Sequence, residues 1–401
     1  MVAILRKILI TLCIVILAGW LLNYSWQKRH IVYKDYSFSD LETIDLRYFP
    51  KVQYEYGLLA WLRNNTPVAV NFFRRAVSKD PFYIDAWLMM VQAEAAMGRL
   101  DNAQAILKFT DNLTTSVFRW KWRQMLLAHD LGLEDIFQRN ANYILSKRQM
   151  LRDTFQMLDI HYKSSVPDTL HVLGKDNLVP YLEWLMGWGR INDTYVVWEE
   201  IGRQHMKDTK IVKKYTHFLV GKKDIMKAEA IWQEETGTTG MMNKGFEEEI
   251  IKSGFGWRYW DHRNWKIKRV KSPVYEGSYA LEIKFIGQKN PSFHHLYQIV
   301  PVEPLKSYCL TYKWKSKGIT SDQGPFVEIY NYGKGKVRCK GHMIKGTNDW
   351  TDEAIEFTTP KECHAVVIRV RRVPSRRFDC NISGQVWLDN FRLELLNGGR
   401  Q

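Results

Sequence analysis

Between about residues 45 and 240, apolar side chains recur every three or four positions and prolines are few. That spacing is the period of an amphipathic α-helix. A second period lies on top of it: Ala69 and Phe73 are followed, about 34 residues later, by Ala103 and Leu107. Paired helices can approach closely only where side chains are small, and a large residue one turn on fills the groove beside them. The sequence therefore predicts stacked helical hairpins.

These landmarks resemble the tetratricopeptide repeat. The segment MGRLDNAQAIL at 97–107 is echoed by WGRINDTYVVW at 188–198, and Pro81 closes a second helix. The resemblance is good over residues 50–115 and weak over 116–240. It implies an α-solenoid that presents a surface to a protein partner. The alternative is that the helices only hold the next domain away from a membrane.

Near the N-terminus, the apolar run ILITLCIVILAGWLL covers residues 8–22 and is followed by an aromatic cluster that ends at Trp26. Extended to Trp26, the segment approaches the ~20 residues that a membrane-spanning helix needs, with aromatic residues at one interface. We therefore expect one transmembrane anchor over residues 8–26, in the inner (cytoplasmic) membrane, with the body facing the periplasm or cell exterior. A cleaved signal peptide is the alternative.

From residue 241 the residue pattern changes to short segments in which apolar and polar residues alternate. The segments are 279–285, 308–314, 326–332, 364–371 and 385–395. Many short strands separated by turn-forming clusters indicate an antiparallel β-sandwich or jelly roll. The predicted fold class is therefore multidomain α + β. Its expected parts are a membrane anchor (1–30), a helical repeat domain (31–240) and a β-sandwich (241–401).

The motifs NKGFEE at 243–248 and VWLDNFRLE at 386–394 bracket the strand-rich region. Their order resembles that of jelly-roll carbohydrate-binding modules related to the galactose-binding-like fold, over nearly all of 243–395. The resemblance implies glycan binding. It also implies a structural calcium where the first and last strands meet, held by Glu247 and Asp389, since carboxylate oxygens suit Ca²⁺. Ordinary solvated carboxylates are the alternative.

The positive charge is concentrated in this β region. Of a total net charge of +15, residues 241–401 supply 27 Lys and Arg against 17 Asp and Glu. In TYKWKSK, residues 311–317, lysine occupies every second position, so a strand there would place its lysines opposite Tyr312 and Trp314. We expect this strand to pair as a hairpin with 326–332.

That hairpin and the segment 364–371 would expose one face of mixed lysine, arginine and tyrosine. The predicted ligand-binding residues are Lys313, Lys315, Tyr330, Tyr332, Arg369 and Arg371. Aromatic rings offer platforms for sugar faces, and Lys and Arg bind carboxylate or phosphate through charge-assisted hydrogen bonds. The face therefore predicts an anionic polysaccharide or glycolipid. Anionic lipid headgroups are a second target, and a solvated strand face with no ligand is the alternative.

Four cysteines, Cys309, Cys339, Cys363 and Cys380, lie in the β region. They could form two disulfides in three connectivities, or remain buried thiols. No cysteine or histidine pair has the spacing of a zinc site.

The sequence carries no common catalytic motif. His294 and His295, beside Tyr297, are the one cluster that would suit a lyase or hydrolase. The domain order looks like that of accessory proteins of bacterial surface polysaccharide assembly. We therefore expect a non-catalytic, membrane-anchored adaptor in polysaccharide biosynthesis or export, with a protein partner on the helices and no nucleic acid partner. A polysaccharide lyase or hydrolase, and a purely structural scaffold, are the alternatives.

Overall fold

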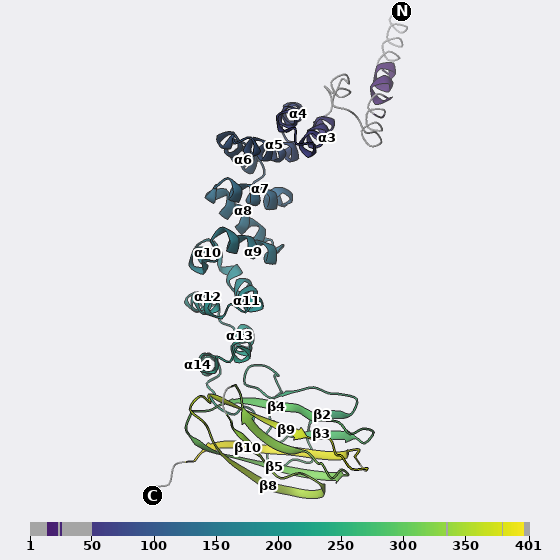
Figure 1. Cartoon of the computed structure of the whole chain (residues 1–401), viewed down its shortest axis with the longest axis vertical. Coiled ribbons are helices and arrows are strands. Elements are labelled where there is room, and N and C mark those ends of the chain that lie inside the picture. The colour runs from purple at the N-terminus through teal and green to yellow at the C-terminus, as the bar shows by residue number, and fades with distance from the viewer. Residues whose placement is uncertain (1–13, 23–24, 26–49, 334–335, 379, 397–401) are drawn as a thin grey trace, which may run out of the picture. The chain divides into compact units, whose positions relative to one another are not determined.

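The computed structural model describes residues 14–22, 25, 50–333, 336–378 and 380–396, and Figure 1 traces the chain. The chain divides into two compact units, Met1–Trp184 and Leu185–Gln401. Helices build the first unit, and the second contains further helices followed by two β-sheets. The sheets confirm the strand-rich C-terminal part of the predicted α + β class.

The structure contradicts the predicted single-pass membrane location. Within the ranges it describes, no helix is both long enough and apolar enough to cross a membrane. The described part of the apolar run is helical over residues 14–22. The rest of the predicted anchor, residues 8–13, 23–24 and 26, lies outside the described residues.

Pairs of helices of similar length follow one another along the first unit and into the second. Their bounds are α3 (Pro50–Leu62), α4 (Thr66–Lys79), α5 (Ile84–Ala96), α6 (Leu100–Leu113), α7 (Phe118–Asp130), α8 (Glu134–Ser146), α9 (Leu151–His161), α10 (Val166–Val172), η1 (Lys175–Asn177), α11 (Leu178–Trp188), α12 (Ile191–Arg203), α13 (Thr209–Gly221) and α14 (Ile225–Thr236). Successive helices pack on each other, α3 on α4, α5 on α6, α7 on α8 and α13 on α14. The predicted helical hairpins are therefore present.

The small residues lie where helices touch. A Cβ atom added to Gly57 in α3 would come within 2.4 Å of the Phe73 ring in α4. Ala60, Ala69 and Ala76, in the same two helices, are completely buried. The two helices thus approach closely because one surface lacks side-chain bulk and an aromatic ring fills the space, as the sequence pattern predicts.

A buried ion pair, which the sequence analysis missed, joins α6, α7 and α8. The Asp111 side chain is 0% exposed and its Oδ1 accepts a hydrogen bond from Lys121 Nζ, which is 1% exposed, at 3.1 Å. Asp111 also accepts hydrogen bonds from Arg139 Nε at 3.0 Å and Asn140 Nδ2 at 3.0 Å. Every polar atom of the carboxylate is therefore satisfied inside the helical core, which is the condition under which a buried charge can persist.

Within the described residues, ten strands form two antiparallel five-stranded sheets. Their bounds are β1 (Arg258–Tyr259), β2 (Trp265–Val270), β3 (Ala280–Ile286), β4 (Phe293–Pro301), β5 (Ser307–Ile319), β6 (Phe326–Asn331), β7 (Arg338–Lys340), β8 (Gly346–Thr358), β9 (Ala365–Arg372) and β10 (Ser383–Leu395). One sheet, here sheet A, has the order β1-β4-β9-β6-β7, and the other, sheet B, has the order β2-β3-β10-β5-β8. Side chains from both sheets share one apolar core.

The predicted hairpin between residues 308–314 and 326–332 is wrong. Strand β5 pairs with β8 and β10 in sheet B, whereas β6 pairs with β7 and β9 in sheet A. The alternation within each strand is as expected, because Tyr312 and Trp314 of β5 and Val327 and Ile329 of β6 are buried. Two such strands can bury their apolar sides equally well as neighbours or as facing layers of a sandwich, and alternation cannot distinguish these arrangements.

The last helices and the sandwich belong to the same compact unit. The Tyr332 hydroxyl donates to the Val220 carbonyl at 2.9 Å, which ties the end of β6 to α13. A Cβ added to Gly254 would come within 2.4 Å of the Trp232 ring of α14, so the segment before β1 packs tightly on that helix. These contacts fix the position of sheet A against α13 and α14.

Candidate ligand-binding face

The lysines of β5 are engaged with acidic side chains of β8. Lys313 lies directly opposite Asp352 and forms an ion pair with it. Lys315 Nζ lies 2.5 Å from Asp349 Oδ1. Lys313 also lies over the Tyr275 ring, with its Nζ 4.4 Å from the centroid. The lysine stripe of TYKWKSK is therefore built into cross-strand charge pairs on the outer side of sheet B.

The other four predicted ligand residues belong to sheet A. Tyr330 lies in β6, Arg369 and Arg371 lie in β9, and Tyr332 follows β6. The six predicted residues are therefore divided between the two sheets of the sandwich and do not form one surface. Sheet A brings Tyr330, Arg369 and Arg371 together, and it separates them from Lys313 and Lys315.

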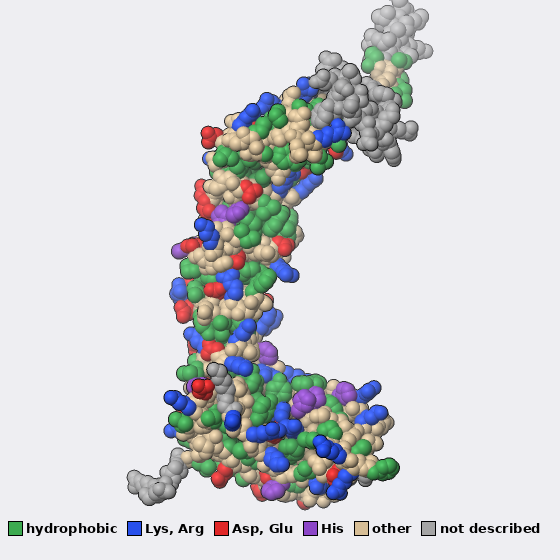
Figure 2. Space-filling model, viewed as in Figure 1, with side chains coloured by type: hydrophobic (Ala, Val, Ile, Leu, Met, Phe, Trp, Pro, Cys, Tyr) green, Lys and Arg blue, Asp and Glu red, His purple; other side chains and the backbone are tan. Residues whose placement is uncertain are grey.

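Glu328 is the centre of the cluster on sheet A. Its side chain is only 3% exposed, and it forms ion pairs with three arginines: Arg338 Nε at 3.1 Å, Arg369 Nη2 at 2.6 Å and Arg371 Nη1 at 2.9 Å. The strand register places Arg369 opposite Glu328 across the β6–β9 pair. Figure 2 shows how basic side chains gather with histidines on the sandwich. We call Tyr297, Glu328, Tyr330, Arg338, Arg369 and Arg371 the arginine–tyrosine face.

The charges of this face do not cancel. One carboxylate offers about four acceptor positions, whereas each guanidinium carries five N–H donors, so three arginines keep donors that Glu328 cannot satisfy. Burial alone would raise the pKa of Glu328, but hydrogen bonds from Arg369 and Arg371 outweigh it and hold the pKa below its usual value. Glu328 therefore remains ionised and fixes the arginines, while their surplus positive charge and donors face outward.

Tyr330 in β6 and Tyr332, just after β6, make different contacts. The Arg369 guanidinium lies 4.3 Å from the centroid of the Tyr330 ring, so this ring helps to hold the arginine flat on the face. Burial raises the pKa of Tyr330. The Tyr332 hydroxyl instead donates a hydrogen bond to the Val220 carbonyl. Of the two predicted tyrosines, Tyr330 is part of the cluster and Tyr332 joins the sandwich to α13.

Aromatic and imidazole rings continue the face along β4. Tyr297 lies opposite Arg369 in the β4–β9 register. Trp260 makes edge contacts with Tyr297 and with His295, at centroid distances of 6.2 and 4.8 Å. His294 stacks on His295. Trp260 is 47% exposed, which gives the face an accessible aromatic rim.

Both histidines are held in the neutral form. Burial lowers the pKa of His294, and the charges of Arg369 and Arg371 lower it further. Burial, together with His294 and His262, lowers the pKa of His295 to about 4. At neutral pH the pair therefore contributes hydrogen-bonding rings and no positive charge to the arginine–tyrosine face.

Sequence reasoning missed the central role of Glu328 and the contribution of Tyr297. Alternation along β6 already places Glu328 on the outer side, opposite Val327 and Ile329. The sequence does not reveal that β6 pairs with β9 and β9 with β4, and this pairing brings the arginines and the second tyrosine to Glu328.

The predicted calcium ligands lie at one loop, but their oxygens already have partners. Asp389 Oδ2 accepts backbone N–H groups of Tyr275 at 2.9 Å and Glu276 at 3.3 Å, and Glu247 Oε1 accepts that of Ser278 at 3.0 Å. Calcium takes six to eight oxygen ligands, and N–H groups aimed at the same carboxylates repel a cation. Among the residues with described positions, no three His, Cys, Asp or Glu side chains gather to hold a metal. This donor set does not fit calcium, whose binding stays an untested prediction.

The four cysteines of the sandwich are free thiols in the structure. Cys363 is fully buried, and burial raises its pKa. Of the two alternatives left open by the sequence, the arrangement corresponds to unpaired thiols.

No protein-family model matches the chain, and no curated protein matches it. Solved structures similar to it include carbohydrate-binding modules with a β-sandwich. A family 61 module in complex with β-1,4-galactotriose is 19% identical with a TM-score of 0.28, and the match covers 39% of this chain and 99% of that one. A family 4 module is 16% identical with a TM-score of 0.29, again over 39% and 99%.

The enzymatically active domain of tailspike protein 4 from bacteriophage CBA120 is also similar in part. It is 13% identical with a TM-score of 0.31, and the match covers 39% of this chain but only 21% of the tailspike chain. The function proposed below rests on this chain's own residues.

Proposed function

We propose that the sandwich binds an anionic polysaccharide or glycolipid through the arginine–tyrosine face, without chemical turnover. The observation that carries the proposal is the buried Glu328 surrounded by three arginines. The carboxylate stabilises the fold and also holds the guanidinium groups rigid and pre-positioned, which reduces the cost of ordering them when a ligand binds. Arginine binds carboxylate and phosphate in a bidentate manner, and Tyr297 and Trp260 supply platforms for sugar rings.

The geometry favours this face over the lysine stripe of β5. Lys313 and Lys315 each have an acidic neighbour of their own, so the local charge is balanced pair by pair. On sheet A one carboxylate faces three arginines, which leaves the local charge at +2. A diffusing polyanion is attracted to the unbalanced charge.

The experiment compares neutral, uronate-containing and phosphorylated polysaccharides as ligands of the full chain by isothermal titration calorimetry. We expect binding of acidic polymers, and a loss of about tenfold or more in affinity for Arg369→Ala/Arg371→Ala, since charge-assisted hydrogen bonds are removed. Lys313→Ala/Lys315→Ala is the matched control because it removes the same charge from sheet B. Loss of binding in the lysine variant alone would refute the assignment of the face.

The same samples test the absence of turnover. Lyase cleavage of a uronate polymer creates an unsaturated product that absorbs in the ultraviolet, and hydrolysis creates reducing ends. We expect neither to accumulate above the level of a protein-free control. Product formation that disappears in His294→Ala would establish the enzyme alternative instead.

For the helices, we propose a tetratricopeptide-like role in recruiting a protein partner that assembles or exports the bound polymer. Support comes from a preformed row of polar and aromatic side chains across α5 and α7. Arg119 Nη2 and Trp120 Nε1 both reach Asp85, at 3.2 and 3.0 Å, and Arg123 Nη2 reaches Gln92 at 2.8 Å. Photo-crosslinking from position 119 should capture one defined partner protein that is not captured from position 152, which is exposed on α9. Equal labelling from both positions would refute the proposed partner surface on α5 and α7.

A further inference from the structure

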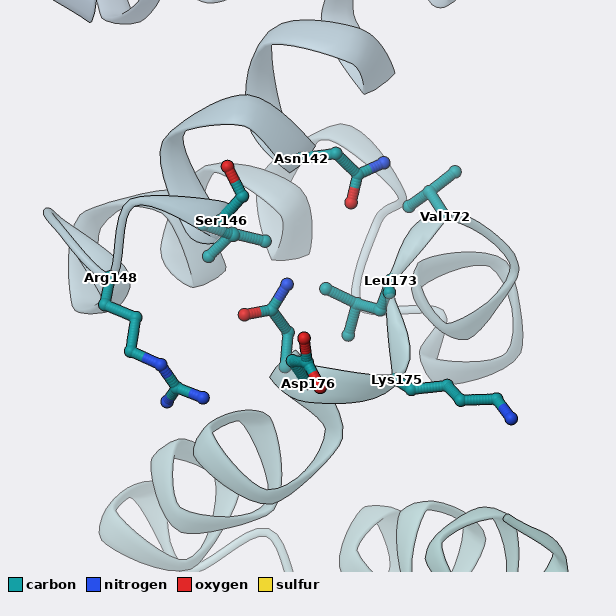
Figure 3. A pocket seen from close by; sticks show the side chains of 10 residues that line it. Asn142, Ser146, Arg148, Val172, Leu173, Lys175 and Asp176 are labelled. Carbon is teal, nitrogen blue, oxygen red and sulfur yellow. The ribbon is translucent and has the colours of Figure 1, made fainter.

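A pocket of about 420 Å³ lies in the helical unit, away from any residue used above. It is bounded by the last turn of α8 and by residues 172–177, which run from the end of α10 into η1. Figure 3 shows these segments surrounding the hollow. Its lining residues are Asn142, Leu145, Ser146, Arg148, Val172, Leu173, Gly174, Lys175, Asp176 and Asn177. Its volume falls within the range of about 300–1,000 Å³ that small-molecule sites span.

The pocket exists because α10 is short. This helix has 7 residues, whereas α7 and α8 have 13 each. Leu173 and Gly174 then adopt extended conformations, with ψ angles of 125° and 151°. The chain therefore passes beside the end of α8 as an extended segment.

One polar side chain of the lining has no hydrogen-bond partner among the described residues. Asn177 is 6% exposed, and no other residue of known position in the structure supplies its side-chain amide with a hydrogen bond. Because Asn177 lines the hollow, a ligand or ordered water there is the available partner.

The remaining lining gives the pocket two kinds of wall. Asn142, Ser146 and Asp176 supply amide, hydroxyl and carboxylate groups, and Figure 3 shows Asp176 among them while Lys175 points its ammonium away. Leu145, Val172 and Leu173 supply an apolar wall. Because the Lys175 ammonium points away, Arg148 stands against Asp176 and the two charges cancel, so the pocket does not select an ion of either sign.

We propose that this pocket binds a small, neutral, hydroxyl-rich ligand of the size of one or two sugar rings. A sugar ring has hydroxyl groups around its edge, which amide and carboxylate side chains bind, and an apolar C–H face, which the leucine and valine side chains cover. The inference is independent of the anionic ligand proposed for the sandwich, because the two sites lie in different units and select different charge.

The test uses the full chain and saturation-transfer difference NMR with glucose, galactose, mannose, N-acetylglucosamine and inositol as probes. Inositol, a carbocycle that has no ring oxygen and no anomeric carbon, separates sugar recognition from general polyol binding. We expect saturable binding of at least one probe, weakened about tenfold by Asn177→Leu, which keeps the side-chain volume but removes the amide.

A second variant fills the pocket and leaves the Asn177 amide in place. A Cβ at Gly174 would meet only Asn177 Nδ2 at 3.9 Å, and the backbone there is one that any residue adopts, so Gly174→Leu should fold and fill the hollow. Arg152→Ala, exposed on α9, is the control that should bind normally. The proposal is overturned if no probe binds, or if Gly174→Leu binds as well as the unmodified chain.

Discussion

The buried pair Lys121–Asp111 allows the sharpest prediction about stability. Asp111→Asn keeps the size of the side chain but leaves the Lys121 ammonium, 1% exposed, without a counter-charge. Breaking a buried ion pair from one side costs about 3–5 kcal/mol, because the remaining charge stays desolvated. Arg139 is half exposed and can return to water, so Lys121 accounts for most of the loss. We expect Asp111→Asn to lower the unfolding free energy of the helical unit by about 3 kcal/mol.

Lys121→Met is the companion variant. It leaves Asp111 with Arg139 and Asn140, so the expected cost is smaller, about 1–2 kcal/mol. The double variant Asp111→Asn/Lys121→Met contains no unpaired buried charge. It should therefore be more stable than Asp111→Asn alone, which is the signature of direct coupling. Urea denaturation followed by far-ultraviolet circular dichroism measures all three, and a double variant whose loss equals the sum of the single losses would refute the reasoning.

Three further predictions concern other parts of the molecule. Gly57→Ala should cost about 1–3 kcal/mol in urea denaturation because its methyl group meets the Phe73 ring; an unchanged midpoint would contradict the close helix contact. The pKa of Glu328 is lowered on folding, so the stabilisation from its charge is present above the unfolded pKa and is lost as pH falls through the folded pKa. Glu328→Gln should therefore be less stable than the unmodified chain at pH 7 but not in acid. A stability difference that does not change with pH would contradict the pairing of Glu328 with the arginines. Calcium or a chelator should leave the melting temperature unchanged, while Glu247→Gln should lower it by loosening Ser278; a calcium-dependent rise would show that the metal binds after all.

The local parts of the fold were predictable. Helical periodicity located the hairpins, and the small residue Ala69 followed by Phe73 marked the helix contact, because both signals arise within one or two adjacent helices. Strand alternation likewise identified which side chains of β5 and β6 are buried. These patterns depend on neighbours along the chain and need no knowledge of the tertiary fold.

The candidate site was only half predictable. Arg369, Arg371 and Tyr330 do meet, but Lys313 and Lys315 lie on the other sheet, because strand order is set by packing between distant segments. The Lys121–Asp111 pair gave no signal at all, since charged residues in a sequence normally indicate a solvent-exposed surface. The apolar run of residues 8–22 led to a different error: its composition favoured a membrane-spanning helix, and the described residues contain none.

The most direct test of the central claim is the salt dependence of polyuronate binding by the full chain. Each basic group that contacts a polyanion adds to the slope of log affinity against log salt concentration. We predict that Arg369→Ala/Arg371→Ala reduces this slope, whereas Lys313→Ala/Lys315→Ala, on the opposite sheet, leaves it nearly unchanged. Equal slopes for the unmodified chain and the arginine variant would contradict the account, because the arginine–tyrosine face would then take no part in binding.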